Sequence, residues 1–256
     1  MQLNTDERDI GIKHQNWKYR KCTMLWSGSD QPDLFNENIK DPEKKERLTL
    51  LGWTDPDCIS YRYNSYGFRD IEFDDRPAGI ALGCSHTEGT GIPESTTWCK
   101  VLSKMLNIHV WNLGVGSSSY DTVFRLLDYW LPRLSPKFVV MLEPTGGRVE
   151  LFNNHNLPIN VGPWSNSSHL AYYKLWVDSE INDIISRRKN LLAMRQLCDN
   201  ANTIFKVLKT SDMMSYPAKE NLATARDLMH CGPKSHGIFA QKMYNLLPQE
   251  ITQNYS

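Results

Sequence analysis

The chain has 256 residues and a net charge of +0, because 29 Lys and Arg residues balance 29 Asp and Glu residues. A neutral chain without blocks of basic residues lacks the charge pattern of nucleic-acid-binding and peripheral membrane proteins, so we expect neither kind of partner. Hydrophobic residues make up 40% of the chain, enough to bury a core, which excludes a largely disordered protein.

Targeting signals and structural metals are not expected either. Phe138–Leu142 is among the longest apolar runs, far short of what a bilayer span requires. The first residues lack a basic segment followed by an apolar one, so no secretory signal is predicted and we expect a cytoplasmic protein. The six cysteines are scattered without a Cys-x-x-Cys pair, which indicates free thiols. We therefore expect no metal and no cofactor.

Residues 1–75 are polar, without clear periodicity, and contain isolated tryptophans and Pro/Asp turns. We interpret them as an irregular N-terminal arm that lies over a domain and is fixed there by large aromatic side chains. A partly disordered tail is the alternative for residues 1–20. The arm is also our candidate for contacting a protein partner.

The rest of the chain, residues 76–256, alternates strand and helix patterns and is expected to form one domain. Buried strands are predicted at 79–83, 108–112, 138–142 and 203–208. Amphipathic helices are predicted at 94–107, 119–131, 179–198 and 233–247. Pro132 is expected to end the second helix because proline has no N–H for the helical ladder. Residues 150–178 break the rhythm and are expected to form a lid or insertion. The alternation predicts a flavodoxin-like three-layer α/β/α sandwich with a parallel sheet.

Polar loops follow the predicted strands. In a parallel α/β sheet, functional groups lie just past the carboxyl ends of the strands. We therefore expect four segments rich in Gly, Ser, Thr, Asp and His to converge on one edge of the sheet: Gly83–Gly89, Asn112–Ser118, Glu143–Arg148 and Asp227–Gly232.

Three of these segments carry a family resemblance. Gly83-Cys84-Ser85-x-Thr87-x-Gly89 resembles the first block of the SGNH (GDSL-type) hydrolases, with Cys84 where the family usually has Asp. The turn at 112–117 is similar to the second block, and Asp227-x-x-His230 matches the C-terminal Asp-x-x-His pair. The resemblance covers roughly residues 78–247 and extends to uncharacterised members from phages and marine bacteria, so a virion location is a second possibility.

The resemblance implies that Ser85 is a nucleophile. A serine hydroxyl is a poor nucleophile until a base takes its proton, which His230 would do. Asp227 would accept a hydrogen bond from the other ring nitrogen and fix the tautomer. The plainer alternatives are a helix-capping serine and a surface histidine. A thiol nucleophile at Cys84 is disfavoured, because the strand-to-loop register places residue 85 at the nucleophile position.

The resemblance also implies an oxyanion hole. Its expected donors are the backbone N–H of Ser85 and that of Gly116 or Ser117, although the glycine spacing of this turn is one residue short of the commonest form. Thr145 stands where the third block usually supplies an Asn side chain. Arg148 is a candidate for binding an anionic or polar substrate group, with a salt bridge at the sheet edge as the alternative.

Neighbouring residues have simpler interpretations. We expect a packing or exposed role for His86, a solvated side chain for Glu88 and a structural role for His236. The aromatic segment Trp164–Trp176 is either a platform that stacks sugars or a lid with inward-packed rings.

The favoured function is a serine esterase that hydrolyses short acyl esters. O-acetyl groups on a carbohydrate are the preferred substrate, because no long apolar acyl channel is visible in the sequence. Two alternatives remain open at this point: an O-acyltransferase that uses the same residues, and a non-catalytic binding or structural module such as a virion component.

Overall fold

A four-stranded parallel sheet forms the centre of the molecule, which we describe from a computed structural model covering residues 12–165, 167–209 and 224–253. The sheet order is β4-β3-β5-β8, so the chain moves outward from β3 and then returns across it to β5. This order is that of a flavodoxin-like sheet. The four strands, each at a predicted position, are β3 (Ala78–Leu82), β4 (His109–Asn112), β5 (Phe138–Leu142) and β8 (Ile204–Leu208).

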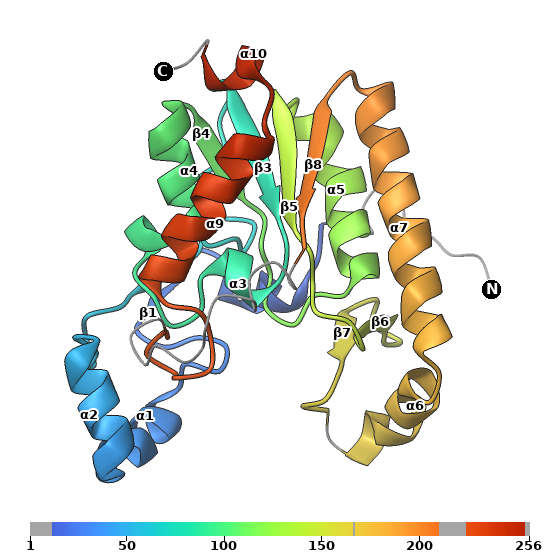
Figure 1. Cartoon of the computed structure of the whole chain (residues 1–256). Helices are drawn as coiled ribbons and strands as arrows, with labels where there is room; N and C mark the ends of the chain where they lie inside the picture. Colours follow the sequence, from blue (N-terminus) through green and yellow to red (C-terminus); the bar gives the residue numbers. More distant parts are fainter. Residues whose placement is uncertain (1–11, 166, 210–223, 254–256) are drawn as a thin grey trace.

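Helices cover both faces of the sheet (Figure 1). Helices α4 (Trp98–Leu106) and α9 (Pro233–Leu246) pack on one face, and α5 (Tyr120–Leu134) and α7 (Glu180–Asn200) on the other. The central strand β5 alternates accordingly, with Val139 and Met141 in the core under α5 and α7, and Val140 in the core under α4 and α9. The predicted three-layer α/β/α sandwich is confirmed.

Two helix boundaries differ from the prediction. Helix α5 continues through Pro132 to Leu134 and ends at Ser135, whose φ is 41°. The prediction that Pro132 ends this helix is wrong because the carbonyl it leaves unpaired belongs to Asp128, which is exposed and can bond water. The helix predicted to begin at residue 94 is split by Thr97, which caps α4 through its side chain after a short 3₁₀ turn (η3, Glu94–Thr96).

The N-terminal arm is more regular than predicted. Its elements are η2 (Gln15–Tyr19), β1 (Thr23–Met24), α1 (Pro32–Lys40), α2 (Pro42–Leu50) and β2 (Tyr61–Arg62). Both helices begin with proline at the first position, and the Asp41 side chain caps α2 by accepting from two backbone N–H groups. The expectation of an irregular arm is wrong here because these capping signals outweigh the weak hydrophobic periodicity.

The arm packs against the domain through its own apolar cluster. Trp53, a predicted aromatic anchor, is buried, and its Nε1 donates to the Thr224 carbonyl at 3.2 Å. The cluster includes Ile92 and Ala225 from the other segment, so the two parts share a core. The division of the chain at residue 75, and a protein partner for the arm, stay predictions.

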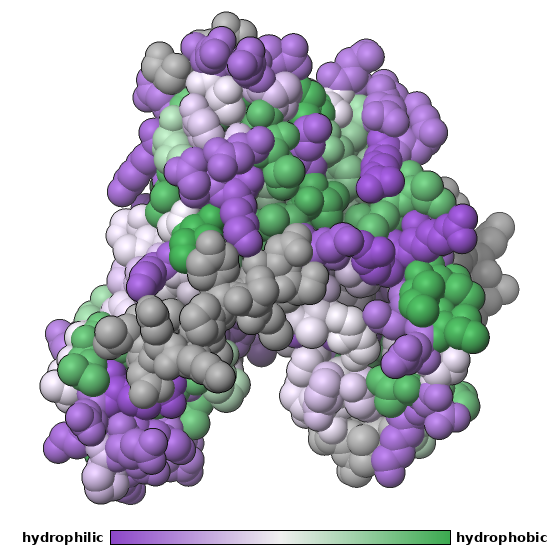
Figure 2. Space-filling view, in the orientation of Figure 1, coloured by the Kyte–Doolittle hydropathy of each residue, from purple (hydrophilic) through white to green (hydrophobic). Residues whose placement is uncertain are grey.

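Residues expected to form a lid or insertion contain a hairpin of β6 (Val149–Phe152) and β7 (Pro158–Val161), followed by α6 (Ser167–Val177). In the space-filling view this segment and the α1–α2 pair form two lobes beneath the sheet, with an indentation between them (Figure 2). The short helix α3 (Ser85–Glu88) lies above and between the lobes (Figure 1), and α10 (Gln249–Thr252) follows α9.

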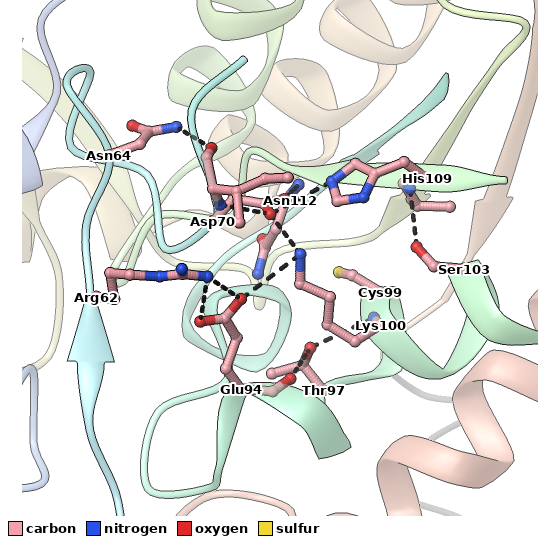
Figure 3. Close-up of polar contacts among 12 residues, drawn as sticks. Arg62, Asn64, Asp70, Glu94, Thr97, Cys99, Lys100, Ser103, His109 and Asn112 are labelled. Carbon is pink, nitrogen blue, oxygen red and sulfur yellow. Dashed lines mark hydrogen bonds and ion pairs between the residues drawn. The ribbon is translucent and has the colours of Figure 1, made fainter. Parts of the chain in front are cut away.

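A buried carboxylate joins the arm to the sheet (Figure 3). The Asp70 side chain is fully buried, pairs with Lys100 and lies 3.3 Å from His109 Nε2. Its Oδ2 accepts from the Asn112 backbone N–H at 2.8 Å. Burial by itself raises the pKa of Asp70, but the contact with the His109 side chain and the charge of Lys100 outweigh it and lower the pKa. Asp70 therefore fixes the end of β4, where the loop at 112–118 begins.

All six cysteines are free thiols, as predicted. Among the helices in the described ranges, none is both long enough and apolar enough to cross a membrane. Nor do these ranges contain a group of three or more His, Cys, Asp or Glu side chains placed to hold a metal ion.

Candidate active site

Ser85 is placed at the carboxyl end of β3 by a tight strand-to-helix turn. Gly83 adopts a φ of 153°, and a Cβ there would lie 2.1 Å from Thr87 Oγ1, so only glycine fits. Cys84 is buried at the cap of α3, and Ser85 is the first residue of this helix. Because β3 lies between β4 and β5, Ser85 lies where the strand order reverses, which is the usual ligand position in such sheets.

His230 is held by a local turn built around Asp227. Asp227 Oδ1 accepts from the backbone N–H groups of Met229 and His230, both at 3.0 Å. The His230 carbonyl in turn accepts from Ala225 N–H at 2.9 Å. The three-residue spacing from Asp227 to His230 thus sets the geometry of this pair locally.

The two segments, 145 positions apart, meet at the sheet edge. His230 Nε2 lies 2.7 Å from Ser85 Oγ, and His230 Nδ1 lies 2.6 Å from Asp227 Oδ2. Both distances suit hydrogen bonds, and the order hydroxyl, imidazole, carboxylate is one that can move a proton from the hydroxyl to the imidazole. The catalytic roles of these three residues stay predictions.

Asp227 is kept ionised by its contacts. Burial alone would raise its pKa, but hydrogen bonds from the His230 side chain and backbone and from Ser29 lower it to about 2. Ser29, in the arm, donates to Asp227 Oδ2 at 2.6 Å and lies 3.3 Å from His230 Nδ1. The arm therefore contributes a residue to this site, which the sequence did not indicate.

A buried ion pair fixes the Asp227 turn to the arm. Arg226 and Asp30 are 0% and 1% exposed, and two guanidinium nitrogens donate to the two carboxylate oxygens at 3.0 and 2.7 Å. Tyr61 also donates to Asp30 at 2.6 Å, and Arg226 stacks over Trp26 at 3.9 Å. The turn that carries His230 is thus held by the arm at the adjacent residue.

Glu88 is buried, so the prediction of a solvated side chain is wrong. Its Oε1 accepts from Tyr63 at 2.6 Å and Asn16 at 2.9 Å, and its Oε2 accepts from Gly116 N–H at 2.6 Å. Burial raises the pKa of Glu88, opposed by these hydrogen bonds and by the charge of Arg69. The arm supplies two of the three donors, which is why solvent does not reach the carboxylate.

The same contact corrects the expectation for Gly116. Its N–H is donated to Glu88 and is not free for an oxyanion. Ser117 follows with a φ of 61°, and within the described ranges its N–H has no hydrogen-bond partner. A Cβ on Gly116 would lie 4.0 Å from Ser85 Cβ, so this turn adjoins Ser85. Ser117 and Ser85 therefore remain the candidate backbone donors, and the role of Thr145, which is half-buried in the loop after β5, stays a prediction.

Arg148 lies at the rim of the site. Its guanidinium donates to the Ser118 carbonyl at 3.4 Å and stacks over the half-exposed ring of Trp164 at 5.1 Å. Within the described ranges it has no carboxylate partner, so the alternative of a salt bridge is not observed there. Next to Arg148, a hollow of about 320 Å³ is lined by Gly146, Gly147 and residues of α6 and α7.

His86 and His236, the two histidines near the site besides His230, are neutral at pH 7 because burial lowers the pKa of each to about 3. His86 packs with its ring centre 5.0 Å from that of His230. Burial, with smaller contributions from the neighbouring His230 and Arg148, lowers the pKa of His86 to about 3. His236 is buried and accepts from the Trp98 backbone N–H at 3.0 Å, which confirms its structural role.

In the aromatic segment Trp164–Trp176, the side chains of Trp164 and Tyr172 are 49% and 43% exposed. The alternative of a lid with inward-packed rings is therefore wrong for these two rings.

The residue that was misinterpreted, Glu88, had a signal in the sequence. Glu88 lies three positions after Ser85, and residues at this spacing share one side of a helix. Ser29 and Gln15 had none, because they contact the site only through the fold of the arm.

Comparison with known proteins gives distant structural matches. No family model and no curated protein sequence matches the chain. The chain is similar to the esterase EstA from Pseudoalteromonas sp., at 14% identity, 68% and 96% coverage of the two chains and a TM-score of 0.37. It is also similar to a family 3 carbohydrate esterase from Clostridium thermocellum, at 12% identity, 70% and 99% coverage of the two chains and a TM-score of 0.38. A third match is the acetyl xylan esterase AlAXEase, at 15% identity, 67% and 100% coverage and a TM-score of 0.36.

Proposed function

We propose that the protein is a serine esterase of the SGNH (GDSL-type) class that hydrolyses short acyl esters. The observation that carries the proposal is the hydrogen-bonded series Ser85–His230–Asp227, with distances of 2.7 and 2.6 Å. The O-acetyl group of a carbohydrate is the proposed substrate, as the sequence suggested.

The reaction has two steps. Ser85 Oγ attacks the ester carbonyl while His230 Nε2 takes its proton, and the oxyanion accepts hydrogen bonds from the Ser85 and Ser117 N–H groups. The protonated imidazole then gives its proton to the leaving alcohol, which leaves an acyl-Ser85 ester. In the second step His230 Nε2 takes a proton from water as the water oxygen attacks the acyl carbon. The imidazolium then returns this proton to Ser85 Oγ as the bond between the acyl carbon and Oγ breaks, which releases the acid and restores Ser85. Asp227 stays ionised and stabilises the imidazolium.

A fluorophosphonate probe and p-nitrophenyl acetate test this proposal. We expect the folded protein to be labelled on one residue, which peptide mass spectrometry locates at Ser85, and to hydrolyse the acetate ester. Labelling depends on an activated serine, so a folded protein that is neither labelled nor active contradicts the proposal and favours the non-catalytic alternative. An acetyl sugar formed when a sugar acceptor is added would instead favour acyl transfer.

We further propose that Arg148 binds an anionic group of the substrate. The guanidinium is held by the Ser118 carbonyl and Trp164, which leaves donors free for a carboxylate or phosphate. Arg148→Met is expected to raise KM for an acetylated uronate about tenfold, since hydrogen bonds to charged groups contribute roughly 1.5–3 kcal/mol and this one is partly solvated. KM for a neutral acetylated sugar should stay within about twofold.

Arg133→Met is the matched control. Arg133 also stacks on an aromatic ring, that of Tyr129 at 3.6 Å, and donates to a carbonyl, but on α5. A change of KM that is equal for the anionic and neutral substrates, or equal in both variants, contradicts a charge-binding role for Arg148.

A further inference from the structure

The turn next to Ser85 contains a strained peptide. Ser117 has a φ of 61°, in the left-handed region that a residue with a Cβ avoids. Rotating the peptide between Gly116 and Ser117 by half a turn would bring Ser117 to a negative φ and relieve the strain. It would also reverse the Ser117 N–H, because the C=O and N–H of a trans peptide point in opposite directions. The strained form must therefore be held by other contacts.

Gln15 of the arm makes the contact that opposes this rotation. Its Nε2 donates to the Gly116 carbonyl, which belongs to the same peptide as the Ser117 N–H. The preceding peptide is fixed by Glu88, which accepts from Gly116 N–H at 2.6 Å. A Cβ on Gly116 would lie 3.0 Å from Glu88 Oε2 and 3.3 Å from Gln15 Nε2, so glycine allows both side chains to close on the turn.

The Gln15 amide is itself oriented. Its Oε1 accepts from Asn160 Nδ2 at 3.4 Å, and Asn160 Oδ1 accepts from Thr122 Oγ1 at 3.0 Å. These contacts direct the Gln15 nitrogen, rather than its oxygen, at Gly116. The flanking residues are fixed too, since a ring nitrogen of His14 contacts the Tyr66 carbonyl at 2.9 Å and Asn16 donates to Glu88. The side chain thus reaches Gly116 from a rigid backbone.

We propose that Gln15 is a positioning residue of the proposed esterase reaction, which holds the Gly116–Ser117 peptide in its strained orientation so that the Ser117 N–H can donate to the oxyanion. The inference rests on the proposed function. It gives the arm a role in catalysis beyond docking: without Gln15 the peptide rotates, relieves the strain at Ser117 and loses a donor that acts only in the transition state.

Kinetics on p-nitrophenyl acetate test the proposal. Gln15→Ala is expected to lower kcat about tenfold with KM within about twofold, because the affected donor binds the transition state and not the ground state. Ser117→Gly in the Gln15→Ala background should recover about fivefold of the loss, since glycine adopts a φ of 61° without strain. A merely structural role for Gln15 would not be rescued by this second change.

Gln196→Ala is the matched control, because Gln196 is exposed on α7 and, in the part of the chain that the structure describes, its side chain bonds only Asn200. Its kcat should equal that of the wild type. An unchanged kcat in Gln15→Ala, or a loss that Ser117→Gly does not recover, overturns the inference while the esterase proposal stands. A wild type and Gln196→Ala that are both folded and inactive overturn the proposed function, and the inference with it.

Discussion

Replacing Ser85 by alanine is expected to lower kcat/KM for an acetyl ester by at least about 10⁴-fold, since loss of the nucleophile in a Ser-His-Asp enzyme leaves only the rate that binding and oxyanion donors provide. The imidazole 2.7 Å away would then have no hydroxyl to deprotonate. The measurement is the steady-state rate on p-nitrophenyl acetate, with circular dichroism to show that both proteins are folded.

Cys84→Ser is the control for this experiment. Cys84 is buried at 1% exposure beside Ser85 and occupies the N-cap position of the same helix without a side-chain capping hydrogen bond, so a similar-sized replacement leaves the site in place. We expect Cys84→Ser to keep its activity to within about a few-fold, because Cys84 supplies no group to the proposed reaction. Full activity in Ser85→Ala, or inactivity in folded Cys84→Ser alone, would contradict Ser85 as the nucleophile.

Asp30→Asn is expected to cause the largest loss of stability, about 3–5 kcal/mol in the free energy of unfolding, because it leaves a buried guanidinium without its charge partner. Arg226 is 0% exposed, and Asp30 accepts from two of its nitrogens and from Tyr61. Urea denaturation followed by circular dichroism measures the change. Because Asp227 follows Arg226 directly, ester hydrolysis should fall as well.

Asp74→Asn provides a matched comparison, since it breaks another Asp–Arg pair, at the boundary between the arm and the domain. The partners Asp74 and Arg76 are 43% and 46% exposed, so water replaces the lost contact and the midpoint of the urea transition should not change measurably. Equal shifts in the two variants would show that the buried pair does not fix the arm to the domain.

Local patterns were the predictable part of the fold. The four strands and the helices that cover them could be predicted because the spacing of their apolar residues matches a strand or one face of a helix. In β5, successive apolar side chains enter the cores on opposite faces of the sheet. Pro132 shows the limit of a purely local rule, since its effect depended on whether the carbonyl of Asp128 faces solvent. The arm was harder to predict because its helices are short and depend on caps and on one shared apolar cluster.

The candidate site divides in the same way. Ser85 and the pair Asp227 and His230 could be recognised because each motif is set by a short stretch of chain, a strand-to-helix turn in one case and an Asp-centred turn in the other. Of the two donors expected in the second turn, Gly116 was wrong because a side chain from helix α3, that of Glu88, accepts from its N–H. No rule about glycine spacing contains that information.

By itself, the sequence determined the layered α/β architecture and the two short motifs, because periodicity and turn chemistry act over a few residues. Only the tertiary structure decided which groups surround the motifs. Asn16 reaches Glu88 across 72 positions and Ser29 reaches Asp227 across 198, and such contacts exist only once the arm has folded over the sheet edge. Their residue types carry no local signal, since a polar side chain in a turn is equally suited to solvent until a distant segment buries it.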